Sequence, residues 1–411
     1  MDGIQYRFIS LIGLGAMVML AWVLSENRKA APWRLVVWGV ALQFAIGLVI
    51  LKTPLKGAVF SGMQQTVHIL TSSTLEGATM VFGSLSTDAN LGALFAFQVL
   101  PVIIFVSTLA AILHHLRVIQ FLVTGIAWVM RRTLKTSGAE TFAAGLLIFM
   151  GIEAVSAVRG YVKGMTRSEL FTVLSTFMAT IAGSVLVIYA SFGAEPGHLL
   201  SASLMSAPAA IVIAKIMVPE LGTPATSGET RVAVEVESTN LIDAAARGVS
   251  QGLNMALQVG AMVLAFVATV YLLDLLLKGA TGWFLDEPLT FSRLMAFVFY
   301  PFAVLLGVPL GDAGAVAQLI GKKTVLNEFL AYLDLKAMIE QSAISPRARM
   351  IATYALCGFA NPGSMAIGIA GLDVLAPERR SEICALSVKS LVAGTLACLM
   401  TACVAGVISY E

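Results

Sequence analysis

Eight apolar stretches alternate with short polar segments along this chain. A helix needs about 20 mainly apolar residues to cross the hydrocarbon core of a bilayer, and about 17 can suffice. The apolar stretches are residues 8–24, 35–51, 91–113, 165–191, 199–218, 253–277, 355–371 and 383–408. The pattern therefore predicts an all-α polytopic membrane protein with about eight transmembrane helices.

Four further segments do not fit a full crossing. Residues 54–90 are only moderately apolar and residues 118–130 are too short, so we expect interfacial helices there. Residues 137–159 turn at a glycine, and residues 292–318 form an apolar, glycine-rich run. Both of these are predicted to be re-entrant helical hairpins, because irregular backbone inside a membrane survives only where protein or a water-filled cavity covers it.

Composition supports the membrane class and narrows the function. Hydrophobic residues make up 58% of the chain and charged residues 12%, whereas an ordinary soluble domain carries about 25% charged residues. A net charge of +2 offers no basic face for nucleic acid. The sequence contains neither a His-Glu-x-x-His motif, nor a Gly-x-Ser-x-Gly elbow, nor a phosphate-binding glycine loop. We therefore expect neither an enzyme nor an organic cofactor.

Charge in the loops predicts how the chain is oriented. Residues 25–34 form a loop rich in Arg and Lys, which the positive-inside rule assigns to the cytoplasm. The first apolar stretch ends without a small-residue cleavage site, so we expect it to be retained as a helix. These features predict a multi-pass protein of the cell (inner) membrane, surrounded by lipid.

The stretch at 355–371 is interrupted at Asn361-Pro-Gly-Ser364. Proline removes a backbone donor and glycine loosens the helix, so polar backbone groups are released halfway across the membrane. A break that carries an amide and a hydroxyl indicates a solute-binding site. Asn254 and Gln258 are four residues apart in another span, share one helix face, and are expected to look inward.

Two acids lie inside the apolar hairpins. Glu153 follows Gly151, and Asp312 lies in the glycine-rich run. A charged side chain in the membrane costs on the order of 2.5–3.5 kcal/mol, so both are candidates for function. The alternative is that each carboxylate only holds its own hairpin tip by accepting backbone amides. With Asn361 and Ser364 they would suit a polyhydroxylated, uncharged solute, and we expect no buried Lys or Arg near the tips to favour an anion.

The chain also contains a loosely repeated sequence pattern. Glu153 precedes Thr166-Arg-Ser-Glu-Leu-Phe171, and Asp312 precedes Thr324-Val-Leu-Asn-Glu-Phe329. After each of them comes a span whose middle contains residues that weaken a helix. Repeated hairpin-plus-broken-helix units are typical of inverted-repeat transporters, although chance similarity is the alternative. The predicted division is 1–136 (N-terminal scaffold helices and an interfacial helix), 137–218 (first hairpin, broken helix and next span), 219–250 (cytoplasmic linker and interfacial stretch), 251–290 (scaffold span) and 291–411 (second hairpin, broken helix and last span).

These motifs resemble those of the concentrative nucleoside transporter family along nearly the whole chain. The resemblance is carried by Ser25-Glu-Asn-Arg-Lys29, Phe95-Ala-Phe-Gln-Val-Leu-Pro101, Met165-Thr-Arg-Ser-Glu-Leu-Phe171, Gly307-Val-Pro309, Ile320-Gly-Lys-Lys-Thr-Val-Leu-Asn-Glu-Phe329 and Ala355-Leu-Cys-Gly-Phe-Ala-Asn361. It implies a homotrimer whose protomers each have eight transmembrane helices, two re-entrant hairpins and a nucleoside site. It also implies elevator-like movement driven by a sodium or proton gradient.

Carried over by position, the resemblance assigns roles to single residues. Glu153 would hold the base and Val185 would contact it, while Phe359 would line the pocket. Asp312, where the family has Glu, would bind ribose hydroxyls together with Asn361 and Ser364. The first hairpin departs from the family, because Gly151-Ile-Glu153 replaces a longer motif that contains a base-reading amide.

The same hairpin bears on the coupling ion. Resemblance implies a sodium site around Met150, Thr180 and Ile181, but Leu147 stands where sodium-coupled members have an asparagine ligand. A leucine side chain supplies no oxygen, so the residues favour proton coupling through Glu153 or Asp312, with sodium as the alternative. The leading hypothesis is an ion-coupled symporter for nucleosides or a related polar solute. The alternatives are an exporter, the same fold carrying another small metabolite, and a non-transporting membrane scaffold or gate protein.

Overall fold

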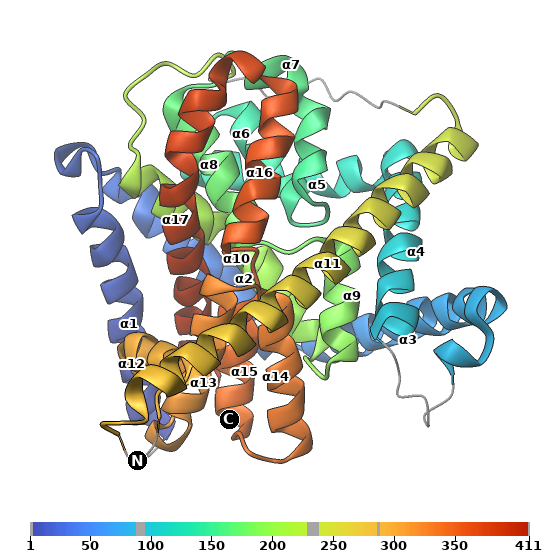
Figure 1. The fold of residues 1–411 in the computed structure, drawn as a ribbon. Helices are drawn as coiled ribbons and strands as arrows, with labels where there is room; N and C mark the ends of the chain where they lie inside the picture. Colours follow the sequence, from blue (N-terminus) through green and yellow to red (C-terminus); the bar gives the residue numbers. More distant parts are fainter. Residues whose placement is uncertain (1–2, 88–94, 228–237, 286–287, 410–411) are drawn as a thin grey trace.

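The computed structural model describes residues 3–87, 95–227, 238–285 and 288–409, except for the side chains of Phe95 and Glu153 (Figure 1). All regular elements in these ranges are helical. Seven segments are long and apolar enough to cross a membrane: α1 (Gly3–Val23), α2 (Trp33–Lys52), α4 (Phe95–His115), α8 with α9 (Arg167–Ala179 and Gly183–Ser191), α10 (Pro196–Met217), α11 (Leu241–Thr281) and α17 (Arg380–Ile408).

The predicted eighth span is present as two half-helices, α15 (Pro346–Leu356) and α16 (Pro362–Leu375). Each half is too short to cross alone, and the break between them falls where Pro362 interrupts the helix. The prediction of an all-α polytopic membrane protein with about eight spans is confirmed. Of the predicted span at 91–113, residues 91–94 lie outside the described ranges, as do residues 228–237 of the predicted linker.

Further helices complete the path between the spans. They are η1 (Arg28–Ala30), α3 (Leu55–Phe82), η2 (Gly83–Ser86), α5 (Val118–Leu134), α12 (Phe291–Leu305) and η5 (Pro377–Arg379). Helix α3 runs crosswise to the upright α4, as expected of an interfacial segment (Figure 1). On α5, Ile119, Val123, Met130 and Leu134 are buried on one face, which gives this helix the amphipathic pattern of a surface-lying segment.

The first hairpin lies where the sequence predicts it. It consists of α6 (Gly138–Leu147), η4 (Ile152–Val158) and α7 (Arg159–Val162), with its tip at residues 148–151. Ser137 and Glu140 form a capping box at its start. Glu140 also pairs with the buried Lys215 of α10, with an Oε2–Nζ distance of 2.8 Å, and this ion pair anchors the base of the hairpin.

The second hairpin lies further along the chain than the sequence analysis predicted. It is formed by α13 (Leu310–Val325) and α14 (Glu328–Glu340), so its tip is at Leu326–Asn327. The prediction of a hairpin at 292–318 is wrong. In that region Gly307, with φ of +77°, makes the turn between α12 and α13. The glycines after it are part of helix α13.

A hairpin, a broken helix and a long helix occur twice in this order, as α6–α10 and as α13–α17. In Figure 1, α8 lies above α9 whereas α15 lies below α16, so the two units run in opposite directions. The internal repeat is real, but its register differs from the predicted one. Ser345, the N-cap of α15, corresponds to Thr166, the N-cap of α8, and Thr324 belongs to the hairpin instead.

The two helix breaks meet in the centre of the molecule. The Phe359 amide donates to the Thr180 carbonyl at 3.3 Å, which joins the break of one repeat to that of the other. Gly358 allows this approach, because a Cβ at this position would lie 2.5 Å from Cys398 Sγ and 2.9 Å from the Ala179 backbone. The two breaks therefore form one crossing backed by α17.

The remaining spans, α1, α2, α4 and α11, pack in two groups. Helices α1 and α2 pack against α10 and α17, and so belong with the repeats. Helices α4 and α11 pack mainly against each other, and Gly248 and Gly252 bring α11 so close that a Cβ would lie 2.6–2.7 Å from the Thr108 and Ile104 Cα atoms. The α4–α11 pair therefore lies beside the repeats as a separate unit.

Two arginines, Arg347 and Arg7, hold neighbouring elements against the end of the last span. Arg347 at the start of α15 donates from Nε to the Gly307 carbonyl and from Nη2 to the Gly406 carbonyl, both at 2.9 Å. Arg7 on α1 donates to the Val407 carbonyl at 2.6 Å. These bonds satisfy carbonyls near the end of α17 and fix α1 beside it.

Candidate functional site

A cavity of about 90 Å³ lies between the second hairpin tip, the two helix breaks and the α4–α11 pair. Its wall is apolar apart from a few polar groups that come together from different elements. The lining residues are Ile103, Gly151, Ile152, Phe177, Val185, Ile188, Tyr189, Met255, Val259, Met262, Val263, Asn327, Glu328, Phe329, Phe359, Asn361, Ser364 and Ile367. Of the predicted substrate residues, the structure brings Gly151, Ile152, Val185, Phe359, Asn361 and Ser364 together here.

Asn361 begins the second half of the broken span. Its Oδ1 accepts from the Ser364 amide at 2.8 Å, which makes Asn361 the N-cap of α16, and Pro362 follows at the first helical position. Its Nδ2 donates to Ser364 Oγ at 3.1 Å. The positive end of the α16 dipole therefore points at the cavity and favours electron-rich groups there.

The acid at this site is Glu328. It is the first residue of α14 after the N-cap Asn327, and its side chain is buried. Its Oε2 accepts from Asn361 Nδ2 at 2.5 Å and its Oε1 accepts from the Tyr189 hydroxyl at 2.8 Å. One carboxylate thus connects the second hairpin, the second break and the first repeat's α9.

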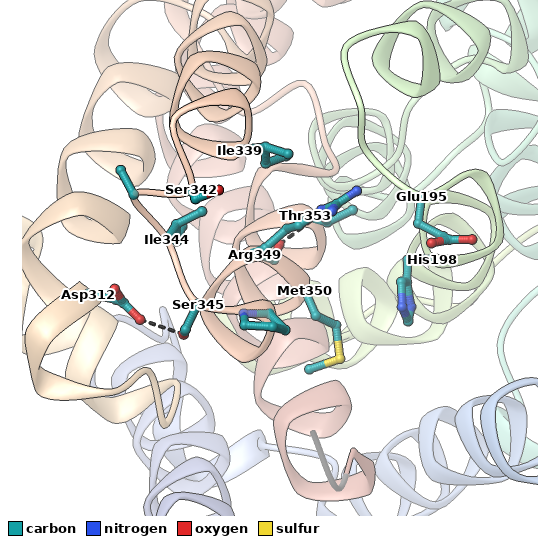
Figure 2. A pocket seen from close by; sticks show the side chains of 12 residues that line it. Glu195, His198, Asp312, Ile339, Ser342, Ile344, Ser345, Arg349, Met350 and Thr353 are labelled. Carbon is teal, nitrogen blue, oxygen red and sulfur yellow. Dashed lines mark hydrogen bonds between the residues drawn. The ribbon is translucent and has the colours of Figure 1, made fainter.

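Asp312 does not reach this cavity. It lies in the first turn of α13, at the opposite end of that helix from the hairpin tip, and its carboxylate accepts from Ser345 Oγ at 2.5 Å. Figure 2 shows Asp312 facing Ser345 at the edge of a second cavity, of about 720 Å³, with Glu195 and His198 on the other side. The expected pairing of Asp312 with Asn361 is therefore corrected, because the glycine-rich segment is the start of α13 and not the tip.

Aromatic side chains form the floor of the site. Phe359 packs against Phe177 with ring centroids 5.6 Å apart, and Tyr189 stacks on Tyr332 with centroids 4.1 Å apart. Val185 lines the same wall. A flat apolar surface thus lies next to the carboxylate–amide pair, which is suitable for a ligand with one planar and one hydroxylated part.

The first hairpin tip closes the other side. Gly151 and Ile152 line the cavity, and Ile152 packs so tightly that a Cβ at Gly371 would lie 2.8 Å from its Cγ1. Glu153 belongs to η4, but its side chain lies outside the described part of the structure. Its predicted contact with a base stays a prediction.

A neighbouring cavity of about 220 Å³ shares Gly151, Met255 and Ile367 with the first one. Asn254, Gln258 and Ser184 line it. Asn254 and Gln258 share one face of α11 as predicted and line this cavity opposite the first hairpin tip, but both side chains are exposed there. The two cavities therefore adjoin each other at the first hairpin tip, α11 and α16.

The positions expected to hold sodium lie behind the first hairpin tip. Thr180 caps the end of α8, and its hydroxyl donates to the Thr176 carbonyl at 2.8 Å, which leaves oxygen lone pairs as acceptors. Ile181 and Leu147 are buried, and Met150 lines the neighbouring cavity of about 220 Å³. Within the described residues there is no cluster of three or more His, Cys, Asp or Glu side chains suited to a metal, so a cation here would rely on hydroxyl and carbonyl oxygens.

The expectation that no buried Lys or Arg lies near the hairpin tips is wrong. Lys323, in the last turn of α13, is 1% exposed, and its Nζ donates to the Ala355 carbonyl at 3.0 Å. Sequence reasoning also missed Glu328 and Tyr189. The sequence signal that could have found Glu328 is Asn327. An Asn before a helix-forming run is a typical N-cap, so it marks the start of a new helix and hence the turn at which Glu328 lies.

Two oppositely oriented repeats with a polar site at their broken helices, inside a bundle of membrane spans, define the fold of an inverted-repeat membrane carrier. Models of known protein families identify the same class of protein. The model described as "Na+ dependent nucleoside transporter C-terminus" matches residues 198–406, its N-terminal counterpart matches residues 12–85, and a "Nucleoside recognition" gate model matches residues 96–196. The chain belongs to the concentrative nucleoside transporter family.

Individual relatives agree over nearly the whole chain. The human solute carrier family 28 member 3 is 38% identical across 98% of this chain, and the uncharacterized transporter YutK of Bacillus subtilis is 40% identical across 96% of this chain and 98% of its own length. The chain spans only 59–60% of the length of the mouse, rat and human solute carriers. Among solved structures, CNTnw in an inward-facing substrate-bound state is 36% identical with a TM-score of 0.91, over 98% of this chain and 97% of that one.

Proposed function

We propose that this protein is a secondary active transporter that carries nucleosides, or a closely related uncharged polar solute, across the cell (inner) membrane. The observation that carries the proposal is the Glu328–Asn361 pair, in which a hairpin tip and a helix break share a hydrogen bond of 2.5 Å beside an aromatic wall. Midplane sites built from broken helices are typical of secondary transporters. Membership of the family supports the substrate class.

In the proposed binding mode the sugar and the base occupy different parts of the first cavity, of about 90 Å³. Glu328, Asn361 and Ser364 bind the ribose hydroxyls, because a carboxylate and an amide can accept and donate to adjacent hydroxyls. The base lies against Phe359 and Val185, and Gly151 and Ile152 cover it. Glu153 is proposed to reach the base from the first hairpin.

Movement is proposed to follow an elevator scheme within a homotrimer. The α4–α11 pair is the stationary part, and the repeats move along it together with α1 and α2, which pack on α10 and α17. This grouping reassigns α1 and α2, which the sequence analysis had put with the scaffold. The site lies between the two parts, so a shift of the repeats exposes it to one side or the other.

We propose sodium as the coupling ion. The family models are described as sodium dependent and the rat relatives include sodium/nucleoside cotransporters, whereas the comparisons give no support to the proton that the residues alone favoured. Thr180 Oγ1 and the carbonyls of Met150 and Ile181 would supply oxygens. These carbonyls lie at a hairpin tip and a helix break, where backbone groups lack helical partners.

Uptake into proteoliposomes tests the substrate and the ion together. We expect radiolabelled uridine or adenosine to accumulate under an inward sodium gradient and not under a pH gradient alone. Nucleosides are expected to raise the melting temperature, since a ligand that binds only the folded state stabilises it. If no nucleoside stabilises the protein and none is taken up under either gradient, the alternatives of another metabolite or a non-transporting scaffold replace this proposal.

The sodium site can be tested with Thr180→Val. Loss of one oxygen ligand is expected to raise the sodium concentration for half-maximal uptake several-fold, with little change in maximal uptake at saturating sodium. Thr176→Val is the matched control, because its hydroxyl also bonds one turn back, to the Thr172 carbonyl, inside α8. Equal sodium dependence of the two variants would argue against an ion at Thr180.

A further inference from the structure

A row of amide side chains on α11 faces the cavity that adjoins the first one. Gln251, Asn254 and Gln258 are three and four residues apart, so they lie on one face of this helix. All three line the neighbouring cavity of about 220 Å³ together with the first hairpin tip. Asn254 and Gln258 belong to the apolar part of α11, where a polar side chain is costly unless it faces protein or water. The row therefore indicates contact with water or a solute rather than with lipid.

The three amides form no side-chain hydrogen bond with any residue in the described parts of the chain. Glutamines on other helices differ, since Gln43, Gln98 and Gln120 each donate to a backbone carbonyl at 2.8–3.3 Å. Ser184 of α9 lines the same cavity and is buried, and its hydroxyl likewise has no partner among the described residues. Donors and acceptors without protein partners around one cavity are available to a ligand or to water.

The first cavity by itself is small for a nucleoside. It measures about 90 Å³ and the neighbouring cavity about 220 Å³, whereas small-molecule sites commonly measure about 300–1,000 Å³. The two cavities share Gly151, Met255 and Ile367, so a glycine and two side chains lie between them. A methionine side chain has several rotatable bonds and adapts its shape readily. A ligand larger than the first cavity therefore extends into the neighbouring one.

The end of the ligand that reaches the amides is the base. In the first cavity, the polar side chains of Glu328 and Asn361 gather where the ribose is proposed to bind. The wall proposed for the base, Phe359 and Val185, has no side-chain donor or acceptor. Val185 lines the first cavity and the preceding residue, Ser184, lines the neighbouring one, so this wall leads directly to the amides.

We propose that Asn254 and Gln258 are specificity-determining residues that hydrogen-bond the polar edge of the nucleobase. A carboxamide presents a donor beside an acceptor, and it pairs with an adjacent donor and acceptor on a base edge, as with N6 and N7 of adenine. Both residues belong to α11, the proposed stationary part, so the contact is made in the position of the repeats that the structure shows. The inference rests on the proposed function, because it requires the solute to be a nucleoside.

The double variant Asn254→Leu/Gln258→Leu removes both amides at similar side-chain size. We expect the Kd for adenosine, measured by titration calorimetry, to rise at least about tenfold, because the hydrogen bonds to the base edge are lost. The preference for adenosine over purine riboside, which lacks the exocyclic amino group, should shrink at the same time. Binding of purine riboside also shows that the variant is folded. Gln65→Leu is the matched control, because this amide is exposed on α3 and lies outside the neighbouring cavity.

A chemical measurement tests the position of the base edge directly. Of the four cysteines, Cys384 alone is exposed, so Cys384→Ser provides a background without a reactive native thiol. In this background the Asn254→Cys variant should react with a water-soluble thiol reagent, because the side chain at this position lines an open cavity. Saturating adenosine should slow the reaction several-fold by covering the thiol.

The outcomes separate this inference from the proposed function. If the unmodified protein neither binds nor takes up a nucleoside, it is the proposed function that fails. If the unmodified protein binds adenosine and the double variant binds it equally well, only the inference is overturned. The same holds if the double variant loses adenosine and purine riboside to the same extent, or if adenosine does not protect the Asn254→Cys variant, since the amides then do not contact the base.

Discussion

Replacing Glu328 with Gln is expected to weaken nucleoside binding about 10- to 100-fold while the protein still folds. The carboxylate accepts from Asn361 and Tyr189 and is proposed to accept from the ribose. Hydrogen bonds to a charged group contribute about 1.5–3 kcal/mol each, and about 1.4 kcal/mol corresponds to a factor of ten. Titration calorimetry of the purified protein with uridine or adenosine, followed by uptake at several concentrations, measures the loss.

Asp312→Asn is the control for this experiment. Asp312 has a similar chemistry but contacts Ser345 at the far end of α13. We expect its removal to leave nucleoside affinity within about twofold of the unmodified protein, as is usual for sites without shared partners. A larger effect at Asp312 than at Glu328 would reverse the assignment of the acid.

Gly358→Ala is expected to lower the melting temperature by several degrees and to reduce uptake. The new methyl group would lie 2.5 Å from Cys398 Sγ and 2.9 Å from the Ala179 backbone, at the crossing of the two helix breaks. Overpacking of this kind costs about 1–3 kcal/mol. Adding Cys398→Ala should recover part of the loss, because it removes the sulfur but not the Ala179 backbone.

Gly15→Ala on α1 is the matched glycine control. A Cβ there meets no atom within 4 Å, and alanine is a better helix former than glycine. We expect an unchanged or slightly higher melting temperature, measured in the same detergent. The account of the crossing would be wrong if Gly358→Ala were as stable as Gly15→Ala.

The spans, the first hairpin and the break at Asn361 could be predicted from sequence because each depends on local chemistry. Span length follows from the thickness of the bilayer, and Pro362 marks the interruption directly. Asn361 and Ser364 were predicted from the break itself, and Phe359 and Val185 from the resemblance; the structure brings all four to one cavity.

The second hairpin was predicted at the wrong place because glycine occurs both in turns and inside transmembrane helices. Gly307 forms a turn with positive φ, whereas Gly311 and Gly314 lie inside α13, and composition does not separate these cases. The predicted hairpin tip was therefore about one helix too early in the chain, and Asp312 was predicted as the site acid instead of Glu328. Lys323 could not be recognised either, since its partner is a carbonyl freed by a break much further along the chain.

The contact between α1 and α17 also bears on how the chain is made in the cell. Residues Arg7 and Val407 are hydrogen-bonded, although nearly the whole chain separates them. Helix α1 is synthesised long before α17, so this contact forms only after α17 has been inserted into the membrane. A chain that lacks α17 should therefore lack the hydrogen bond between Arg7 and the Val407 carbonyl.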